Sequence, residues 1–134
     1  SSSGQNGNLG GAPGADGRRQ NLANLAKLPG TYKAWLSDAT SSPATRFTKA
    51  TVPYTLVDGT VIAQNWTDLI SGTLRHAIDL TKQGTGIPGI DQAWTATEAN
   101  GSIGRPILAT RGWTNYDSIS SCNASSRLYS FPQQ

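Results

Sequence analysis

The chain has 134 residues and a net charge of +3, and only 14% of its residues are charged, well below the roughly 25% of typical soluble domains. This length suits one domain that folds without a metal or a disulfide, and no apolar run approaches the roughly 20 residues of a membrane helix. The Lys and Arg residues are scattered, which argues against a nucleic-acid-binding face. Gly, Ser, Thr and Asn dominate the polar sequence, and this is typical of a loop-rich fold with short strands.

The first elements follow a polar start. Residues 1–14 are almost all small or polar and predict a linker or loosely docked arm from an upstream stalk, so we expect the folded domain to span 15–134. Asp16 is expected to cap a helix that runs to about Lys27 and stops at Pro29-Gly30. The expected apolar face of this helix consists of Leu22, Leu25, Ala26 and Leu28.

The middle of the chain predicts short strands and one further helix. Residues 32–36 predict a strand with Trp35 buried, and 37–45 predict a polar loop. Alternating apolar residues flank Asp58-Gly59, which indicates a β-hairpin with a type I′ turn. Asn65 is expected to cap a short helix over 66–71.

The second half predicts few regular elements. Residues 74–80 predict an extended piece, 83–91 a loop rich in Gly and Pro, and 93–97 a strand around Trp94. An irregular stretch over 100–116 follows, and 127–131 alternates as expected of a terminal strand. Long loops in a compact domain are usually functional.

Residues that carry catalysis or bind metals are scarce. His76 is the only histidine and lies in no recognised nucleophile pattern, so a structural role is favoured. A zinc site needs several Cys or His ligands, which the chain lacks. We therefore predict no cofactor, no metal and no catalytic residue. Cys122, the single cysteine, is either buried and inert or available for an intermolecular bond.

The aromatic residues divide into two groups. Five of them lie within strand or helix patterns and are predicted to belong to the core: Trp35, Tyr54, Trp66, Trp94 and Tyr129. Trp113 and Tyr116 form the second group and stand among adaptable polar groups in the late loops, a mixture typical of paratopes and sugar sites. The predicted ligand-binding residues are Arg105, Arg111, Trp113, Asn115, Tyr116, Asp117 and Ser118. Trp113 can also anchor a loop to the core, and the two roles are compatible.

Several runs carry a resemblance to a known family. The more specific ones are Gly7-Asn8-Leu9-Gly10-Gly11, Gly14-Ala15-Asp16 and Gly30-Thr31-Tyr32-Lys33-Ala34-Trp35-Leu36-Ser37-Asp38. Others follow in order: Ser42-Pro43-Ala44-Thr45-Arg46-Phe47, Leu56-Val57-Asp58-Gly59-Thr60-Val61-Ile62-Ala63, Asn65-Trp66 with Asp68-Leu69, Leu74, Trp94-Thr95, Gly112-Trp113-Thr114, Ser121-Cys122 and Arg127-Leu128-Tyr129. In these runs the chain resembles bacterial surface and lipoprotein domains of unassigned function, described as endostatin-like within the wider C-type-lectin-like fold.

The resemblance implies a single C-type-lectin-like, endostatin-like α+β domain with short strands, one or two helices and a long loop region. In that fold the N- and C-terminal segments lie together, and the loop region, here about 98–126, binds the ligand. Some members are adhesins, and related domains form tips of phage or bacterial fibres. An extracellular or cell-surface location follows from the resemblance.

Departures from the family pattern concern cysteines and calcium. Arg19 and Ser130 stand where family members tend to have cysteines that the resemblance pairs, and Thr110 stands where a partner of Cys122 is expected. Losing two disulfides removes about 2–4 kcal/mol of stability each. The triplets of calcium-dependent sugar binding are missing, so that function is not implied.

Three functional hypotheses remain. The first is a non-enzymatic recognition domain, an adhesin or receptor-binding fibre tip, whose late loops bind a glycan or a surface protein of a target cell. The second is a structural cap that ends a fibre as an oligomer, such as a homotrimer held by an upstream stalk. The third is an enzyme acting on polysaccharide, which needs a pair of acids across a cleft that the sequence does not suggest. None of the three involves nucleic acid or insertion into a membrane.

Overall fold

The structure is a computed structural model that describes residues 9–38, 40–88, 93–95, 103–104 and 126–133. It confirms a small α+β domain with short strands. The helices are α1 (Gly11–Leu25), α2 (Pro43–Arg46) and α3 (Trp66–Leu69). The strands are β1 (Tyr32–Ala34), β2 (Tyr54–Thr55), β3 (Val61–Ala63), β4 (Ala93–Trp94), β5 (Ile103–Gly104), β6 (Arg127–Leu128) and β7 (Ser130–Pro132).

Helix α1 begins earlier than the sequence predicted. Its N-cap is Gly10 in the left-handed region (φ 73°), and the predicted cap, Asp16, lies inside the helix. A Cβ on Gly14 would stand 2.1 Å from the carbonyl oxygen of Leu9, so only glycine lets the helix fold back against the preceding turn. Leu9 and Ala12 are buried, so this part of the predicted arm belongs to the folded domain.

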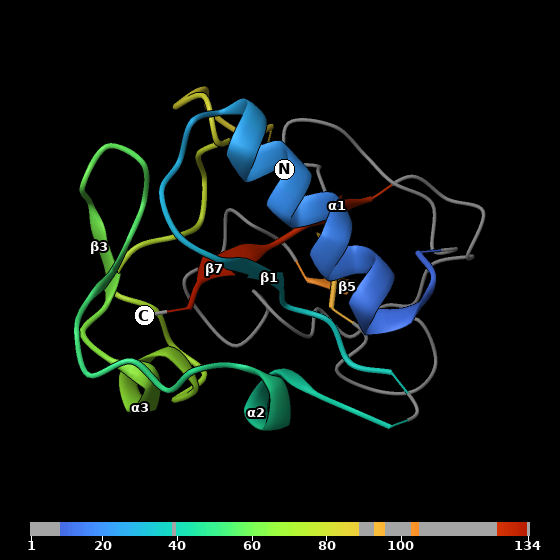
Figure 1. Cartoon of the computed structure of the whole chain (residues 1–134). Coiled ribbons are helices and arrows are strands. Elements are labelled where there is room, and N and C mark those ends of the chain that lie inside the picture. Colours follow the sequence, from blue (N-terminus) through green and yellow to red (C-terminus); the bar gives the residue numbers. More distant parts are fainter. Residues whose placement is uncertain (1–8, 39, 89–92, 96–102, 105–125, 134) are drawn as a thin grey trace.

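The predicted apolar face of α1 is wrong. The buried side chains of α1 are Ala12, Ala15, Arg19 and Ala23. Leu25, expected on the inner face, is 78% exposed. Helix α1 lies beside β1 and packs against it (Figure 1), and the small alanine side chains allow a close approach where leucines would hold the helix away. The inner face of α1 is therefore narrow and contains one cation.

Helix α1 ends in a Schellman motif before Pro29-Gly30. The Leu28 N–H donates to the carbonyl of Ala23 (3.0 Å), and the Lys27 N–H donates to the carbonyl of Asn24 (3.0 Å). Lys27 has a φ of 54° and occupies the left-handed position where glycine is commonest. The backbone hydrogen bonds thus end the helix before proline is reached.

The two ends of the folded chain meet in one sheet. Strand β1 pairs antiparallel with β7, with Lys33 opposite Phe131. The predicted terminal strand is two strands, because the chain changes partner at Tyr129: β6 pairs parallel with β4 and β7 pairs with β1. The carbonyl of Tyr129 accepts from the Trp35 N–H (3.1 Å) and joins the two pairings.

The predicted hairpin forms from β2 and β3, but not with a type I′ turn. Gly59 has a φ of 90°, whereas Asp58 is not among the non-glycine residues with positive φ. The Gly59 N–H donates to the carbonyl of Leu56 (3.0 Å), and the Leu56 N–H donates to the carbonyl of Thr60 (2.8 Å). A three-residue loop of this kind needs only one left-handed residue, which spares Asp58 that conformation.

Local signals explain the two short helices. In α2, within the predicted polar loop, Ser42 and Thr45 bond each other's backbone as a capping box, and Pro43 occupies the first turn. The predicted cap of α3 is confirmed, because the Asn65 side chain accepts from the Asp68 N–H (2.9 Å). The predicted extended piece over 74–80 contains no strand, only an isolated bridge between Leu80 and Gly86.

Aromatic rings fill the main core. The ring of Trp35 packs edge-on against Phe47 and Phe131, with centroids 5.7 and 5.5 Å away, and Tyr54 packs edge-on against Phe131 at 5.8 Å. Of the predicted core aromatics, Tyr54, Trp66 and Tyr129 are buried and Trp35 is half-buried. The side chain of Trp94 lies outside the described residues.

Two glycines of α1 give a matched test of its packing. Gly14→Ala is expected to destabilise the protein by about 1–3 kcal/mol, because its Cβ meets the Leu9 carbonyl. Gly17→Ala meets nothing within 4 Å and should stabilise it by about 0.5–1 kcal/mol through helix propensity. Chemical denaturation of both variants checks the pair, and equal effects would contradict the close approach at Gly14.

Candidate functional site

The predicted ligand-binding residues lie outside the described part of the chain. This holds for Arg105, Arg111, Trp113, Asn115, Tyr116, Asp117 and Ser118, and also for Thr110 and Cys122. Within the predicted loop region, 98–126, the structure describes β5 and Ser126. The prediction for these side chains therefore stays a prediction, while the base of the region is described.

The base of the loop region is a three-stranded sheet with the order β5-β4-β6. Strand β4, which leads into the region, pairs parallel with β6, which follows it, so that Trp94 lies opposite Leu128. Thr95 and Ser126, beside these strands, are both buried. The carbonyl of Thr95 also accepts from the Ser37 N–H (3.2 Å). Both ends of the region are thus fixed within one sheet.

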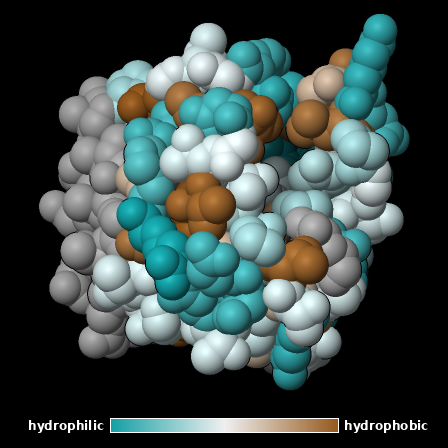
Figure 2. Space-filling view, turned by 90° about the vertical axis from the view of Figure 1, so that its left-hand side faces the viewer, coloured by the Kyte–Doolittle hydropathy of each residue, from teal (hydrophilic) through white to brown (hydrophobic). Residues whose placement is uncertain are grey.

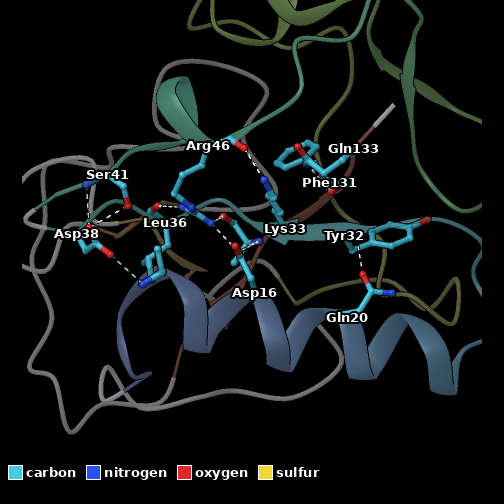
Figure 3. A network of polar contacts seen from close by, with 12 residues as sticks. Asp16, Gln20, Tyr32, Lys33, Leu36, Asp38, Ser41, Arg46, Phe131 and Gln133 are labelled. Atoms are coloured by element: carbon cyan, nitrogen blue, oxygen red, sulfur yellow. Dashed lines mark hydrogen bonds and ion pairs between the residues drawn. The ribbon is translucent and has the colours of Figure 1, made fainter.

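A polar network centred on Asp16 and Arg46 holds this framework (Figure 3). The Asp16 carboxylate on α1 accepts from the Arg46 guanidinium (2.6 Å) and from the Ala34 N–H (2.8 Å). Arg46 also donates to the Leu36 carbonyl (2.6 Å), and its own carbonyl accepts from the Lys33 ammonium (2.6 Å). Helices α1 and α2 are therefore both joined to β1 and the residues after it.

Asp38 caps α1 from a distant part of the chain. Its carboxylate accepts from the Ala12 N–H in the first turn (3.0 Å) and from the N–H and hydroxyl groups of Thr40 and Ser41. These donors, the Ala12 N–H first, hold the pKa of Asp38 well below its usual range. The charged form is therefore the one that stabilises the start of the helix.

A cavity of about 500 Å³ lies between the C-terminal half of α1 and the core. Its apolar wall includes Leu22, Leu56, Ile78, Leu80 and Phe131. The volume falls within the range of small-molecule sites. The face seen in Figure 2, which is the left-hand side of Figure 1, carries separate apolar patches and is hollowed toward its upper right.

Arg19 lines this cavity and is 2% exposed. Its Nε and Nη2 are shielded from solvent and have no hydrogen-bond partner among the described residues. Burial, together with the nearby charge of Arg18, lowers the pKa of Arg19 to about 10. Sequence reasoning noticed Arg19 only as a replaced cysteine. Arg19 lies four residues from both Ala15 and Ala23, so a helix that buries these alanines also buries Arg19. The leucines of the helix indicated a different buried face, and the signal was missed.

The other titratable groups form no reactive cluster in the described part of the chain. His76 is exposed, and its Nδ1 lies 2.8 Å from the Ala77 carbonyl and 3.7 Å from the Asp79 carboxylate. Among the described residues, no group of three or more His, Cys, Asp or Glu side chains could hold a metal ion. None of the helices in the described ranges combines the length and the apolar character needed to cross a membrane.

The comparisons with known proteins do not assign the chain to a family. No protein-family model matches the sequence, and no curated protein is significantly similar to it.

The Asp16–Arg46 pair is expected to contribute more stability than an exposed ion pair. Their side chains are 14% (Arg46) and 23% (Asp16) exposed, so Arg46→Ala leaves the Asp16 carboxylate half-buried and should cost about 2–4 kcal/mol. Arg75 pairs with Asp68 at 2.8 Å but is 55% exposed, so Arg75→Ala serves as the control with a much smaller loss. Similar losses in urea denaturation would contradict the role of the network.

Asp38 is expected to make stability depend on acid pH. Its depressed pKa means that its contribution is fully present above the ordinary Asp pKa of about 4 and is lost as the pH falls toward the folded-state value. Asp38→Asn should therefore be less stable than the wild type at pH 7, and the difference should shrink below about pH 4. Unfolding measured from pH 7 to pH 3 checks this, since other carboxylates titrate alike in both proteins. A difference independent of pH would refute the assignment.

Proposed function

We propose that the chain is a non-enzymatic recognition domain that works outside the cell as an adhesin or receptor-binding fibre tip. It binds a glycan or a surface protein of a target cell through the loop region 98–126. The observation that supports this most is that the residues on either side of the region belong to or adjoin one sheet, where Ala93, Thr95, Ser126 and Leu128 are buried. Binding residues are commonly found on loops that a rigid scaffold positions.

The geometry of the base favours a binding loop over a simple connection. Strands β4 and β6 are parallel neighbours, so the chain must cross over between them, which takes about a dozen residues or more. The sequence devotes 96–125 to this connection, well beyond that minimum, and the connection includes β5 on the other side of β4. Loops of this length inside a compact domain are usually functional.

The proposed fold is C-type-lectin-like and endostatin-like. One described feature supports what the resemblance implies: the first strand, β1, pairs with the last, β7. The described residues form a small α+β domain, and the lectin-like fold is part of the proposal. Fold kinship alone does not define a ligand, so the proposed function depends on the loop region and its side chains.

The proposal is tested on an array of glycans and matrix proteins probed with the multivalent domain. The wild type should bind selectively, and Trp113→Ala/Tyr116→Ala should weaken that binding by roughly 30-fold or more, as expected for aromatic anchors. Val52→Ala, which changes an exposed apolar residue before β2, is the control and should bind normally.

Thermal unfolding of each variant shows whether it is folded. Undiminished binding by a folded double variant would move the site away from these two residues. A wild type that binds nothing selectively on the array would contradict recognition and favour the structural cap.

A further inference from the structure

We propose that the cavity lined by Arg19 is a second binding site, which takes a small organic carboxylate with an apolar body. The lining residues described for this site lie outside the loop region 98–126, and the site does not depend on the function proposed for that region. The inference combines an apolar cavity of about 500 Å³ with a buried cation that lacks a partner among the described residues.

The guanidinium indicates the chemistry of the ligand. Nε and the neighbouring Nη2 form one edge with two parallel N–H donors, which match the two oxygens of a carboxylate. Both are the nitrogens that lack partners. A buried charge without a counter-charge is costly, so an anion that enters the cavity gains this interaction in full.

The walls indicate the rest of the ligand. Leu22, Leu80 and Phe131 line the cavity together with Tyr32 and Tyr54, and Lys82 and Arg127 are also among its lining residues. A strongly hydrated ion such as free phosphate would lose its water against these walls without recovering it. An aliphatic or aromatic chain that ends in a carboxylate can pack against the apolar side chains of the cavity and pair with the guanidinium of Arg19.

Binding requires a movement of Arg19. In the present conformation Nε and Nη2 are shielded from solvent, although the side chain lines the cavity. The proposal requires that rotation about the terminal torsions of Arg19 turn the donor edge into the cavity, with the backbone of α1 unchanged. The ligand therefore selects a rotamer of Arg19 rather than a new fold.

Octanoate and octan-1-ol are matched probes, because they share the apolar chain and differ in the carboxylate. NMR titration of the ¹⁵N-labelled full chain should give saturable binding of octanoate, with shifts at amides around the cavity such as Leu22 and Leu80. Octan-1-ol should bind roughly tenfold more weakly or worse, since it lacks the charge-assisted pair.

Three variants distinguish the contribution of the Arg19 charge from that of the cavity volume. Arg19→Met should lose the preference for octanoate while unfolding at the same or a higher temperature, because an unpartnered buried charge is removed. Arg18→Met removes the same charge from the exposed neighbouring position and should keep the preference. Ile78→Trp adds bulk at another residue that lines the cavity, leaves Arg19 in place and should weaken the binding of both probes.

Several outcomes would overturn the proposal. Equal affinity of the wild type for the two probes, or no binding of either, would exclude a carboxylate site. A preference for octanoate that survives Arg19→Met would assign recognition to another group. A large loss of stability in Arg19→Met would show that the guanidinium has a partner within the folded chain.

Discussion

The position of α1 depends on the ion pair between Asp16 and Arg46. One carboxylate oxygen accepts from Arg46 of α2 and from the Ala34 N–H of β1, and the same guanidinium reaches the Leu36 carbonyl. Three segments far apart in the sequence are therefore held through one largely buried pair. Separating the pair would leave a partly buried carboxylate without a partner and would lower the stability of the fold, so the relative positions of these segments are strongly restrained. The buried alanines of α1 pack on β1 in the position in which Asp16 joins the helix to this strand.

From β1 the same restraint extends to the base of the loop region. Strand β1 pairs with β7, Trp35 bonds to Tyr129, and Ser37 bonds to Thr95 at the end of β4. Because β4 and β6 are neighbours, the segment after Ala34 is attached to both ends of the region 98–126. The helix, the first strand and the last strands thus act as one scaffold. Such a scaffold lets a loop region vary in sequence while its base stays fixed.

Local signals predicted some elements well, and tertiary contacts decided the others. Asn65 caps α3 because the cap needs only its own side chain and the next turn, and the hairpin around Gly59 is encoded just as locally. The start of α1 depends on the close approach of Gly14 to the Leu9 carbonyl and on the hydrogen bond from the Ala12 N–H to Asp38. The spacing of apolar residues along the sequence does not reveal these contacts. The leucines of α1 suggested the wrong buried face because tertiary packing decides it: the space beside β1 is narrow and accommodates alanine side chains.

The candidate sites differ in how far the sequence can reveal them. The aromatic and polar composition of 98–126 points to a binding loop without any structure, whereas Arg19 becomes notable only when α1 is docked and its cation is enclosed. Arg19 and Ser130, the positions at which the resemblance implies paired cysteines, both line the cavity. Because Nε and Nη2 of Arg19 have no partner among the described residues, burial of this cation is expected to cost stability. A bound anion removes that cost, so folding and binding would be linked at this one residue.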